Sequence, residues 1–211
     1  MGRGSQAQAR QNRRRVVDTA SRLFREQGTE VSVADLMKAA GLTHGGFYKQ
    51  FASKEALIGE ATARAFEEHA DVRAGALERH EGDREAAQRA FIDAYLSATH
   101  RDNAADGCPA AGLAVDIARG HGDAEARRVF TEQVGDTAAW LATADQDGVV
   151  RLCTMVGALV LARATAGDPL SEDILAAART ALTGDQTTPE RDTARDSHVP
   201  RINYSAQPEQ R

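Results

Sequence analysis

Residues 32–57 read SVADLMKAAGLTHGGFYKQFASKEAL and contain three helix-start signals and one tight turn. Ser32 is placed to accept a hydrogen bond from the free amides at the start of a short helix whose apolar residues share one face. Gly41 is placed to end that helix, because glycine adopts the left-handed backbone conformation at little steric cost. Thr43 follows as the cap of a second helix of about two turns, and Ser53 as the cap of a third. This spacing predicts a helix-turn-helix.

The first residues of the predicted second helix are the ones that a helix-turn-helix places in the major groove of DNA. They are His44, Gly45 and Gly46. Two adjacent glycines cost a helix about 1 kcal/mol each relative to alanine, so a close approach to phosphate explains them better than stability does. Tyr48 and Lys49 follow with a hydroxyl and a charge that can reach the DNA backbone.

The third predicted helix has an unfavourable charge in its first turn. Lys54 lies beside the positive end of the helix dipole, where Glu55 is the expected residue. Lys54 therefore indicates a nearby anion, and DNA phosphate is the obvious one. Phe47 and Phe51 are four residues apart, and we expect both on the face turned to the core.

The charge distribution supports the same interpretation independently. Residues 1–54 hold ten Lys or Arg and four Asp or Glu, whereas residues 55–211 hold sixteen and twenty-seven. The net charge of −5 therefore hides a basic head on an acidic body, as is typical of nucleic-acid binding by one end. Arg13 and Arg14 stand near the front of a helix expected over 10–27, where basic residues oppose the dipole and fit better beside phosphate. The alternative is a soluble, arginine-rich N-terminus.

About a dozen positions match one known pattern in type and spacing. They are Ala39-Ala40-Gly41-Leu42-Thr43, Gly45, Tyr48, Phe51, Ser53-Lys54-Glu55 and Leu57. Together they resemble the DNA-binding domain of the TetR/AcrR family of bacterial transcriptional regulators, and the resemblance covers roughly residues 13–57. It implies an all-helical homodimer, usually a repressor released by a small molecule. Gln50, Phe47 and the second glycine, Gly46, depart from the family pattern, which bears on operator sequence or phosphate contacts rather than on the fold.

The rest of the chain repeats Ala with Leu or Val at three- and four-residue spacing, and no segment shows strand alternation. We predict an all-α protein in four parts: a disordered start over 1–9, a three-helix DNA-binding domain over 10–54, a helical body over 55–183 and a disordered tail over 184–211. By the resemblance, the body binds ligand and dimerises. Its expected helices run over about 53–80, 84–101, 109–119, 123–144, 149–166 and 171–182.

The most apolar stretch of the chain is residues 149–166. Arg151 and Arg163 leave only eleven residues between them, whereas a bilayer span needs about twenty. We therefore predict a buried helix and no membrane association. By the resemblance, this helix and the next would pair with their copies in a four-helix dimer interface, although Gly157 and its small neighbours would also suit an ordinary core helix.

Signals for enzymatic chemistry are missing. No two histidines have metal-ligand spacing on one helix, and there is no phosphate-cradling Gly-Lys-Ser/Thr loop or nucleophile elbow. We predict no catalytic residues, no metal and no cofactor, and we expect His69, His80, His100 and His121 on exposed helix surfaces. A helical enzyme with a vestigial head is the least supported alternative.

Cys108 and Cys153 form no disulfide framework, which together with the lack of a signal peptide indicates a reducing cytoplasm. Cys153 is expected to be a small core residue. Cys108 precedes Pro109 and so occupies a helix cap, where free amides and the dipole lower the pKa of a thiol. The segment GCPAAGL at 107–113 resembles one in a subset of TetR-type regulators, some of which sense reactive compounds through cysteine. The alternative is that Cys108 caps the helix at a pocket edge or simply packs.

These observations predict a cytoplasmic, dimeric, sequence-specific DNA-binding regulator with a palindromic operator. A repressor released by a small molecule or by cysteine modification is the leading hypothesis, and an activator or a ligand-independent DNA binder is the alternative. The predicted DNA contacts are Ser32, Thr43, His44, Gly45, Gly46, Tyr48, Lys49, Lys54, Arg13 and Arg14. The predicted ligand-pocket residues, each of which also suits a core position, are Phe91, Tyr95, Cys108, Leu113, Phe130 and Trp140.

Overall fold

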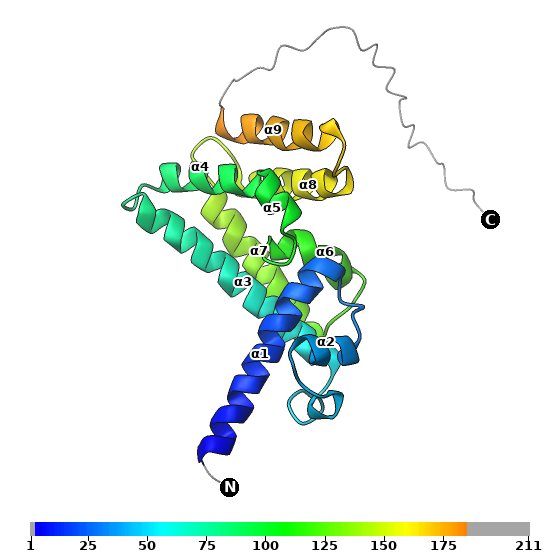
Figure 1. The fold of residues 1–211 in the computed structure, drawn as a ribbon. Helices are drawn as coiled ribbons and strands as arrows, with labels where there is room; N and C mark the ends of the chain where they lie inside the picture. Colours follow the sequence, from blue (N-terminus) through cyan, green and yellow to red (C-terminus); the bar gives the residue numbers. More distant parts are fainter. Residues whose placement is uncertain (1–2, 185–211) are drawn as a thin grey trace, which may run out of the picture.

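A long first helix leads into the rest of the molecule from one end (Figure 1). The computed structural model describes residues 3–184, and α1 covers Arg3–Gln27. The predicted helix start at Arg10 and the disorder predicted before it are therefore wrong for residues 3–9. The stretch Gln-Ala-Gln-Ala at 6–9 consists of strong helix formers, so the helix continues toward the terminus. The predicted tail lies outside the described residues except for Gly184, which ends the last helix with a φ of 72°.

The head is built from α1, α2 (Val33–Ala39), the short 3-10 turn η1 (His44–Gly46) and the start of α3 (Lys54–Arg79). Its core contains Leu36, Met37, Phe47 and Leu57, all fully buried. Two later helices, α6 (Pro109–Ala118) and α7 (Ala124–Leu141), contribute Leu113, Ile117 and Ala126 to the same core. Packing therefore does not divide head from body at residue 54, because α3 runs unbroken from one to the other.

The body is completed by α4 (Arg84–Tyr95), α5 (Ala98–Asp102), α8 (Gly148–Ala164) and α9 (Pro169–Thr183). Figure 1 shows α8 and α9 stacked at the end of the body opposite the head, with α3 and α7 leading toward them. Phe66, Ile92, Leu141, Met155 and Leu159 are at the centre of the body core.

Aspartate side-chain caps explain where four of the body helices begin. Asp83, Asp123, Asp147 and Asp168 each accept a hydrogen bond from a backbone N–H of the first turn. The helix predicted over 84–101 is in fact two, because Ser97 accepts the N–H of His100 at 3.2 Å and starts α5.

Within residues 3–184 every regular element is helical, which confirms the predicted all-α fold with an N-terminal helix-turn-helix. In that same part of the chain, no helix is long and apolar enough to cross a membrane.

Candidate nucleic-acid interface

The turn of the helix-turn-helix forms as the sequence predicts. The Ser32 hydroxyl accepts the N–H of Asp35 at 3.1 Å, and it donates to the Asp35 carboxylate at 2.6 Å. Gly41 has a φ of +68°, and the following N–H, of Leu42, donates to the Met37 oxygen at 2.8 Å. Because Ser32 donates its only proton to Asp35 and also accepts the Asp35 N–H, this serine is occupied as a cap.

The second helix of the motif is shorter than predicted. It is the 3-10 turn His44–Gly46, followed by further turns up to Gln50. Thr43 stands at the cap position with an extended backbone but makes no side-chain cap hydrogen bond. The two glycines and the missing cap both disfavour a regular helix, which explains why the expected two turns of helix are not formed.

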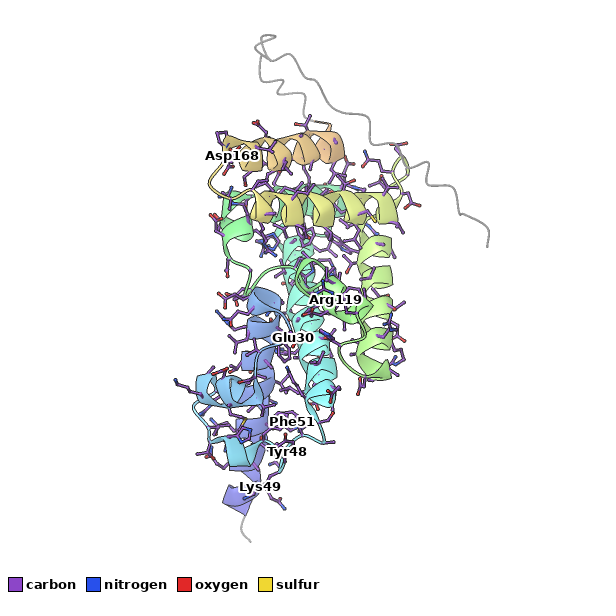
Figure 2. All side chains as sticks on the ribbon, turned by 90° about the vertical axis from the view of Figure 1, so that its right-hand side faces the viewer. Glu30, Tyr48, Lys49, Phe51, Arg119 and Asp168 are labelled. Atoms are coloured by element: carbon purple, nitrogen blue, oxygen red, sulfur yellow. The ribbon has the colours of Figure 1, made fainter. Side chains whose placement is uncertain are left out.

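Two aromatic side chains fix this segment to the head. Phe47 and Phe51 are 0% and 3% exposed, and their rings stack with centroids 5.4 Å apart. Tyr48, which follows Phe47, is instead 67% exposed, and Lys49 is exposed as well. Figure 2 shows Tyr48 and Lys49 at the end of the molecule farthest from α9. The inward pair therefore holds a tyrosine, a lysine and the exposed His44 on the outer surface of the head.

Gly45 and Gly46 are not required by the conformation of the protein itself. An added Cβ would meet no heavy atom within 4 Å at Gly45, and at Gly46 the nearest atom would be Met37 Cε at an ordinary 3.5 Å. Neither glycine has the positive φ that favours this residue type. Alanine would therefore fit at both positions at lower conformational cost.

The start of α3 lies next to this surface. The Ser53 hydroxyl accepts the N–H of Ala56 at 3.1 Å, as its predicted cap role requires. The pKa of Glu55 is lowered by its own backbone N–H and by the Ser53 hydroxyl, so this carboxylate complements the helix dipole. Lys54 forms no ion pair with any described residue.

The two arginines predicted to contact DNA differ in their surroundings. Arg13 donates to the Glu60 carboxylate at 2.5 Å and to the backbone oxygen of Gln50, and its guanidinium lies 4.3 Å from the Phe51 ring centroid. These contacts make Arg13 part of the head's own structure. Arg14 is exposed and has no such partners among the described residues.

The residues predicted to line a ligand pocket are instead packed. Phe91, Tyr95 and Cys108 are at most 5% exposed in the body core, and Phe130 and Trp140 pack against it. Leu113 lies with the residues of the head core instead. A hollow of about 460 Å³ occurs elsewhere, between α4, the α7–α8 loop and the end of α9, and none of these six residues lines it.

Cys108 does not have the environment that its cap position predicts. Burial raises the pKa of the thiol, and this effect outweighs Tyr95, the amides of Ala110 and Ala111, and Arg163, which all act to lower it. The sequence places the thiol at a helix start but does not reveal that the side chain is only 2% exposed. The prediction of a lowered pKa is therefore wrong.

Three histidines expected on exposed surfaces make specific contacts instead. His100 accepts the N–H of Cys108 at 3.1 Å, and its Nδ1 lies 2.7 Å from the Tyr95 oxygen. His69 packs edge-on against Phe91, and burial lowers its pKa to about 3. His121 Nδ1 is 2.9 Å from the Thr29 hydroxyl of the head. Among the described residues, no group of His, Cys, Asp and Glu could hold a metal ion.

Head and body are joined by polar contacts at both ends of α6. At its start, Arg25 of α1 donates to the backbone oxygen of Gly107 at 3.1 Å. At its end, Asp116 accepts the N–H of Thr29 at 2.7 Å. Between them, Gly112 brings α6 so close to α1 that a Cβ would lie 3.0 Å from the Arg25 Cα. A shift of α6 therefore reaches the head directly.

An apolar stripe runs along the outside of α8. Val150 is 62% exposed and Leu161 57% exposed, and Cys153 and Gly157 lie between them on the same helix face. Cys153 is thus an exposed residue, and its predicted place in the core is wrong because it lies on the exposed face of α8. Leu170 of α9 is 51% exposed as well.

A basic, outward-facing turn on a helix-turn-helix head, joined to an all-helical body, places this chain in the helix-turn-helix class of proteins. Residues 16–61 match the family model described as bacterial regulatory proteins, tetR family. Over 61 residues the chain is 38% identical to the HTH-type transcriptional regulator AcrR of Shigella flexneri, a match that spans 28% of each protein.

Solved structures extend the similarity to the body. The reduced form of NemR from E. coli has a TM-score of 0.68 at 18% identity, covering 82% of this chain and 96% of that one. A TetR-family transcriptional regulator from Agrobacterium tumefaciens has a TM-score of 0.68 at 21% identity, covering 82% and 97%. AibR in complex with isovaleryl coenzyme A and operator DNA has a TM-score of 0.56 at 17% identity, covering 82% and 98%. The head of the chain therefore matches the DNA-binding domain of the TetR family, and the described residues have the fold of solved TetR-family regulators.

Proposed function

We propose that the protein is a dimeric, sequence-specific transcriptional regulator that binds a palindromic operator and releases it in response to an effector. We favour repression over activation of the regulated gene. An activator would show the same operator binding, and a ligand-independent DNA binder would show no effector response.

The observation that carries the DNA-binding proposal is the pair Gly45–Gly46 on the exposed turn. The folded chain has room for a Cβ at both positions, so its own packing does not explain two residues that weaken a helix. A DNA phosphate or base edge lying close to the backbone would explain the two glycines. The unused Thr43 hydroxyl, His44, Tyr48 and Lys49 surround this point and offer donors to phosphates and base edges.

Around that centre Lys54 and Arg14 contact phosphates, because neither forms an ion pair with a described residue. Ser32 contributes through the backbone that it caps, since its hydroxyl is already bonded to Asp35. Arg13 is left out of the direct contacts, because Glu60, Gln50 and Phe51 already hold its guanidinium.

Dimerisation through α8 and α9 is supported by the apolar stripe of α8. Val150 and Leu161 are more than half exposed, and the exposed Gly157 lets a second helix come close. Two heads must sit about one turn of DNA apart, roughly 34 Å or a multiple, to read a palindrome. Any effector that moves the heads relative to this interface changes operator affinity.

The route from effector to head is supported by the contacts of α6. A displacement of its start moves Gly107, which Arg25 holds, and a displacement of its end moves Asp116, which holds Thr29. Both contacts end on or next to α1. The predicted pocket among Phe91, Tyr95, Phe130 and Trp140 would have to open by repacking, because these side chains now fill the space.

Modification of Cys108 is a second way to move α6. The thiol is enclosed, so an added group finds no room and must displace the start of the helix. Its raised pKa and burial predict slow reaction with electrophiles. Replacing Cys108→Ser should abolish release of the operator by a quinone, whereas the exposed Cys153→Ser should leave release intact. Equal release from Cys108→Ser and the unaltered protein would remove cysteine sensing from the proposal.

The proposal as a whole is tested by fluorescence anisotropy with the DNA that flanks the protein's own gene and with a scrambled duplex, across a salt series. Preference for one palindromic segment that persists as salt rises supports a specific regulator. Equal binding of both duplexes that falls steeply with salt reports phosphate attraction alone. Failure to find any preferred segment in the surrounding genome would refute the proposal.

A further inference from the structure

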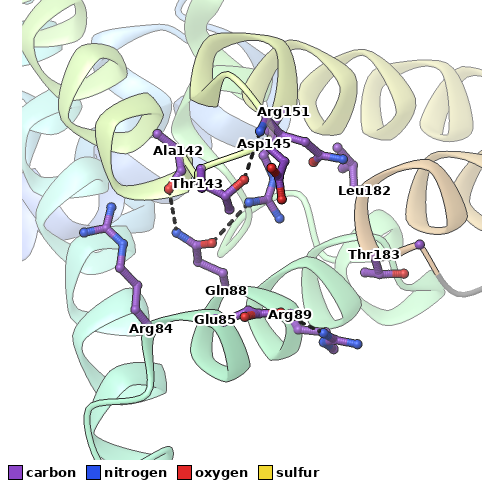
Figure 3. Close-up of a pocket in the computed structure, with 13 residues that line it drawn as sticks. Arg84, Glu85, Gln88, Arg89, Ala142, Thr143, Asp145, Arg151, Leu182 and Thr183 are labelled. Carbon is purple, nitrogen blue, oxygen red and sulfur yellow. Dashed lines mark hydrogen bonds and ion pairs between the residues drawn. The ribbon is translucent and has the colours of Figure 1, made fainter.

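The hollow at the far end of the body has the size of a small-molecule site. Its volume is about 460 Å³, and it lies between α4, the α7–α8 loop and the C-terminal end of α9 (Figure 3). Ligand pockets for small molecules measure roughly 300 to 1,000 Å³. Its wall combines the apolar Ala142, Ala144 and Leu182 with the side chains of Gln88 and Arg151.

Arg151 is the unusual residue of this wall. It is only 5% exposed, yet no carboxylate of the described residues pairs with it. Its Nη1 donates to Gln88 Oε1 at 3.1 Å and to the Leu141 oxygen at 2.8 Å. Its Nε is buried with no hydrogen-bond partner, and Nη2 forms none with the described residues. The guanidinium therefore has one satisfied nitrogen and one unsatisfied edge.

An unsatisfied, buried cation is costly unless something pairs with it. Burial lowers the pKa of Arg151, and no neighbouring charge counteracts the effect. Gln88 cannot neutralise the group, because an amide carries no charge. The edge formed by Nε and Nη2 is the one that carboxylates bind through two parallel hydrogen bonds.

The other charges of the hollow leave a place for one anion. Arg89 is paired with Glu85 at 3.2 Å, and Arg84 donates to the Ala139 and Trp140 backbone oxygens at 2.8 and 2.9 Å. Asp145 is the remaining acidic residue of the wall, and it is exposed and forms no ion pair among the described residues. The site thus has an excess of positive charge, held mainly by Arg151 and Arg84.

We propose that this hollow binds a small organic acid, with its carboxylate on Arg151 and its apolar part against Ala142, Ala144 and Leu182. Nη2 is the nitrogen that the carboxylate reaches first, because Nε is enclosed. Gln88 holds the guanidinium in place from the other side. Since the hollow joins α4 to α8 and α9, the bound acid would act on the dimer face, and this effector role rests on the proposed function.

The test titrates the full-length protein with hexanoate and with hexanamide, its neutral counterpart, and follows the fluorescence of Trp140. This residue reports on the site because its backbone oxygen accepts a hydrogen bond from Arg84, which lines the hollow. Hexanoate should bind saturably with a Kd of about 1 mM, because a ligand with so few atoms makes few contacts. Hexanamide should bind about tenfold more weakly or not at all, because it cannot form the charged pair.

Two variants locate the site, and one serves as a control. Arg151→Met should weaken hexanoate binding about tenfold, as loss of a charge-assisted pair does. Ala144→Phe should block the hollow while leaving Arg151 in place, which keeps the test valid if Arg151→Met fails to fold. Arg119→Met removes another arginine, one that is exposed on the C-terminal side of α6 and lies outside the hollow, and should bind hexanoate normally.

Each remaining outcome would overturn the inference. Equal binding of hexanoate and hexanamide would rule out carboxylate recognition, and inorganic phosphate binding as tightly as hexanoate would rule out an organic acid. Unchanged binding in both Arg151→Met and Ala144→Phe would place the ligand elsewhere. These titrations contain no DNA, so their result is independent of operator binding. Hexanoate added to the anisotropy assay then tests whether the acid also changes affinity for the operator.

Discussion

Arg25 of α1 donates one hydrogen bond to the backbone oxygen of Gly107 at 3.1 Å and another to the carboxylate of Glu68 at 2.7 Å. Gly107 is the residue before Cys108, and Glu68 lies on α3, so one guanidinium joins the head, the long helix and the start of α6. The side chain is almost fully buried. This link is absent from any short sequence motif, because the partners are 82 and 43 residues away.

Replacing Arg25→Met should lower the free energy of unfolding by about 2 kcal/mol, because it removes the donor of the Gly107 oxygen and one of the two arginine partners of the partly buried Glu68 carboxylate, which keeps Arg64 at 3.3 Å. Urea denaturation measures the change. Arg22→Met is the matched control, because Arg22 lies on the same helix and pairs with Asp106 of the same loop, but with both side chains about half exposed. It should cost no more than about 0.5 kcal/mol. Similar losses in the two variants would mean that Arg25 is not a special link.

Replacing Gly45→Ala should separate stability from DNA binding. The free protein has room for the methyl group, so the variant should be as stable or up to about 1 kcal/mol more stable. Operator affinity should fall about tenfold or more if the backbone lies against DNA, as anisotropy would show. Gly135→Ala on α7, which also has no atom within 4 Å of an added Cβ, should gain stability without any change in affinity. An unchanged affinity in Gly45→Ala would contradict the proposed contact.

The head illustrates what the sequence can and cannot reveal. Local signals suffice for Ser32, Gly41 and Ser53, because a cap or a left-handed turn depends on a few neighbouring residues. The sequence does not define the length of the second helix, since the spacing of Phe47 and Phe51 suits a helix and a succession of turns equally well.

Burial was the main feature that local patterns missed. Cys108 and Cys153 both sit on helices, and only the packing of α6 and α8 makes the first enclosed and the second exposed. In the sequence Arg151 only interrupts an apolar stretch, whereas its lack of a carboxylate partner among the described residues depends on the packing of α4 and the α7–α8 loop. The pKa directions of Cys108 and His69 follow from the same three-dimensional packing.

The stripe on α8 predicts a change of oligomeric state on a single substitution. Leu161→Glu places a charge within the proposed dimer face, at one end of the exposed stripe of α8, and should give a monomer in light scattering coupled to size-exclusion chromatography, because the partner cannot bury an unpaired carboxylate. Val115→Glu is the control, since Val115 is similarly exposed, at 58%, but lies on α6. It should remain a dimer. A dimer that survives Leu161→Glu would move the interface away from α8.

Acid sensitivity should depend measurably on His69. Its pKa is about 3 in the folded protein, lowered first by burial and then by Arg73, His100 and Arg25, against an ordinary value of 6.5. Between these two values the unfolded chain binds a proton that the folded protein does not, so the free energy of unfolding falls as the pH falls. The slope from this residue is about 1.4 kcal/mol per pH unit, and above about pH 6.5 the contribution vanishes.

Replacing His69→Phe keeps an aromatic ring against Phe91 and Tyr95 but removes the group that titrates. Urea denaturation repeated from pH 7 to pH 4 should therefore show a shallower loss of stability than in the unaltered protein. The two slopes should differ by about 1.4 kcal/mol per pH unit, the value for one proton. The comparison concerns slopes, so a constant packing cost of the larger ring does not affect it. His44→Gln, on the exposed turn, should leave the slope unchanged. Identical slopes in His69→Phe and the unaltered protein would show that His69 is protonated in the folded state and that its surroundings are wetter than the packing indicates.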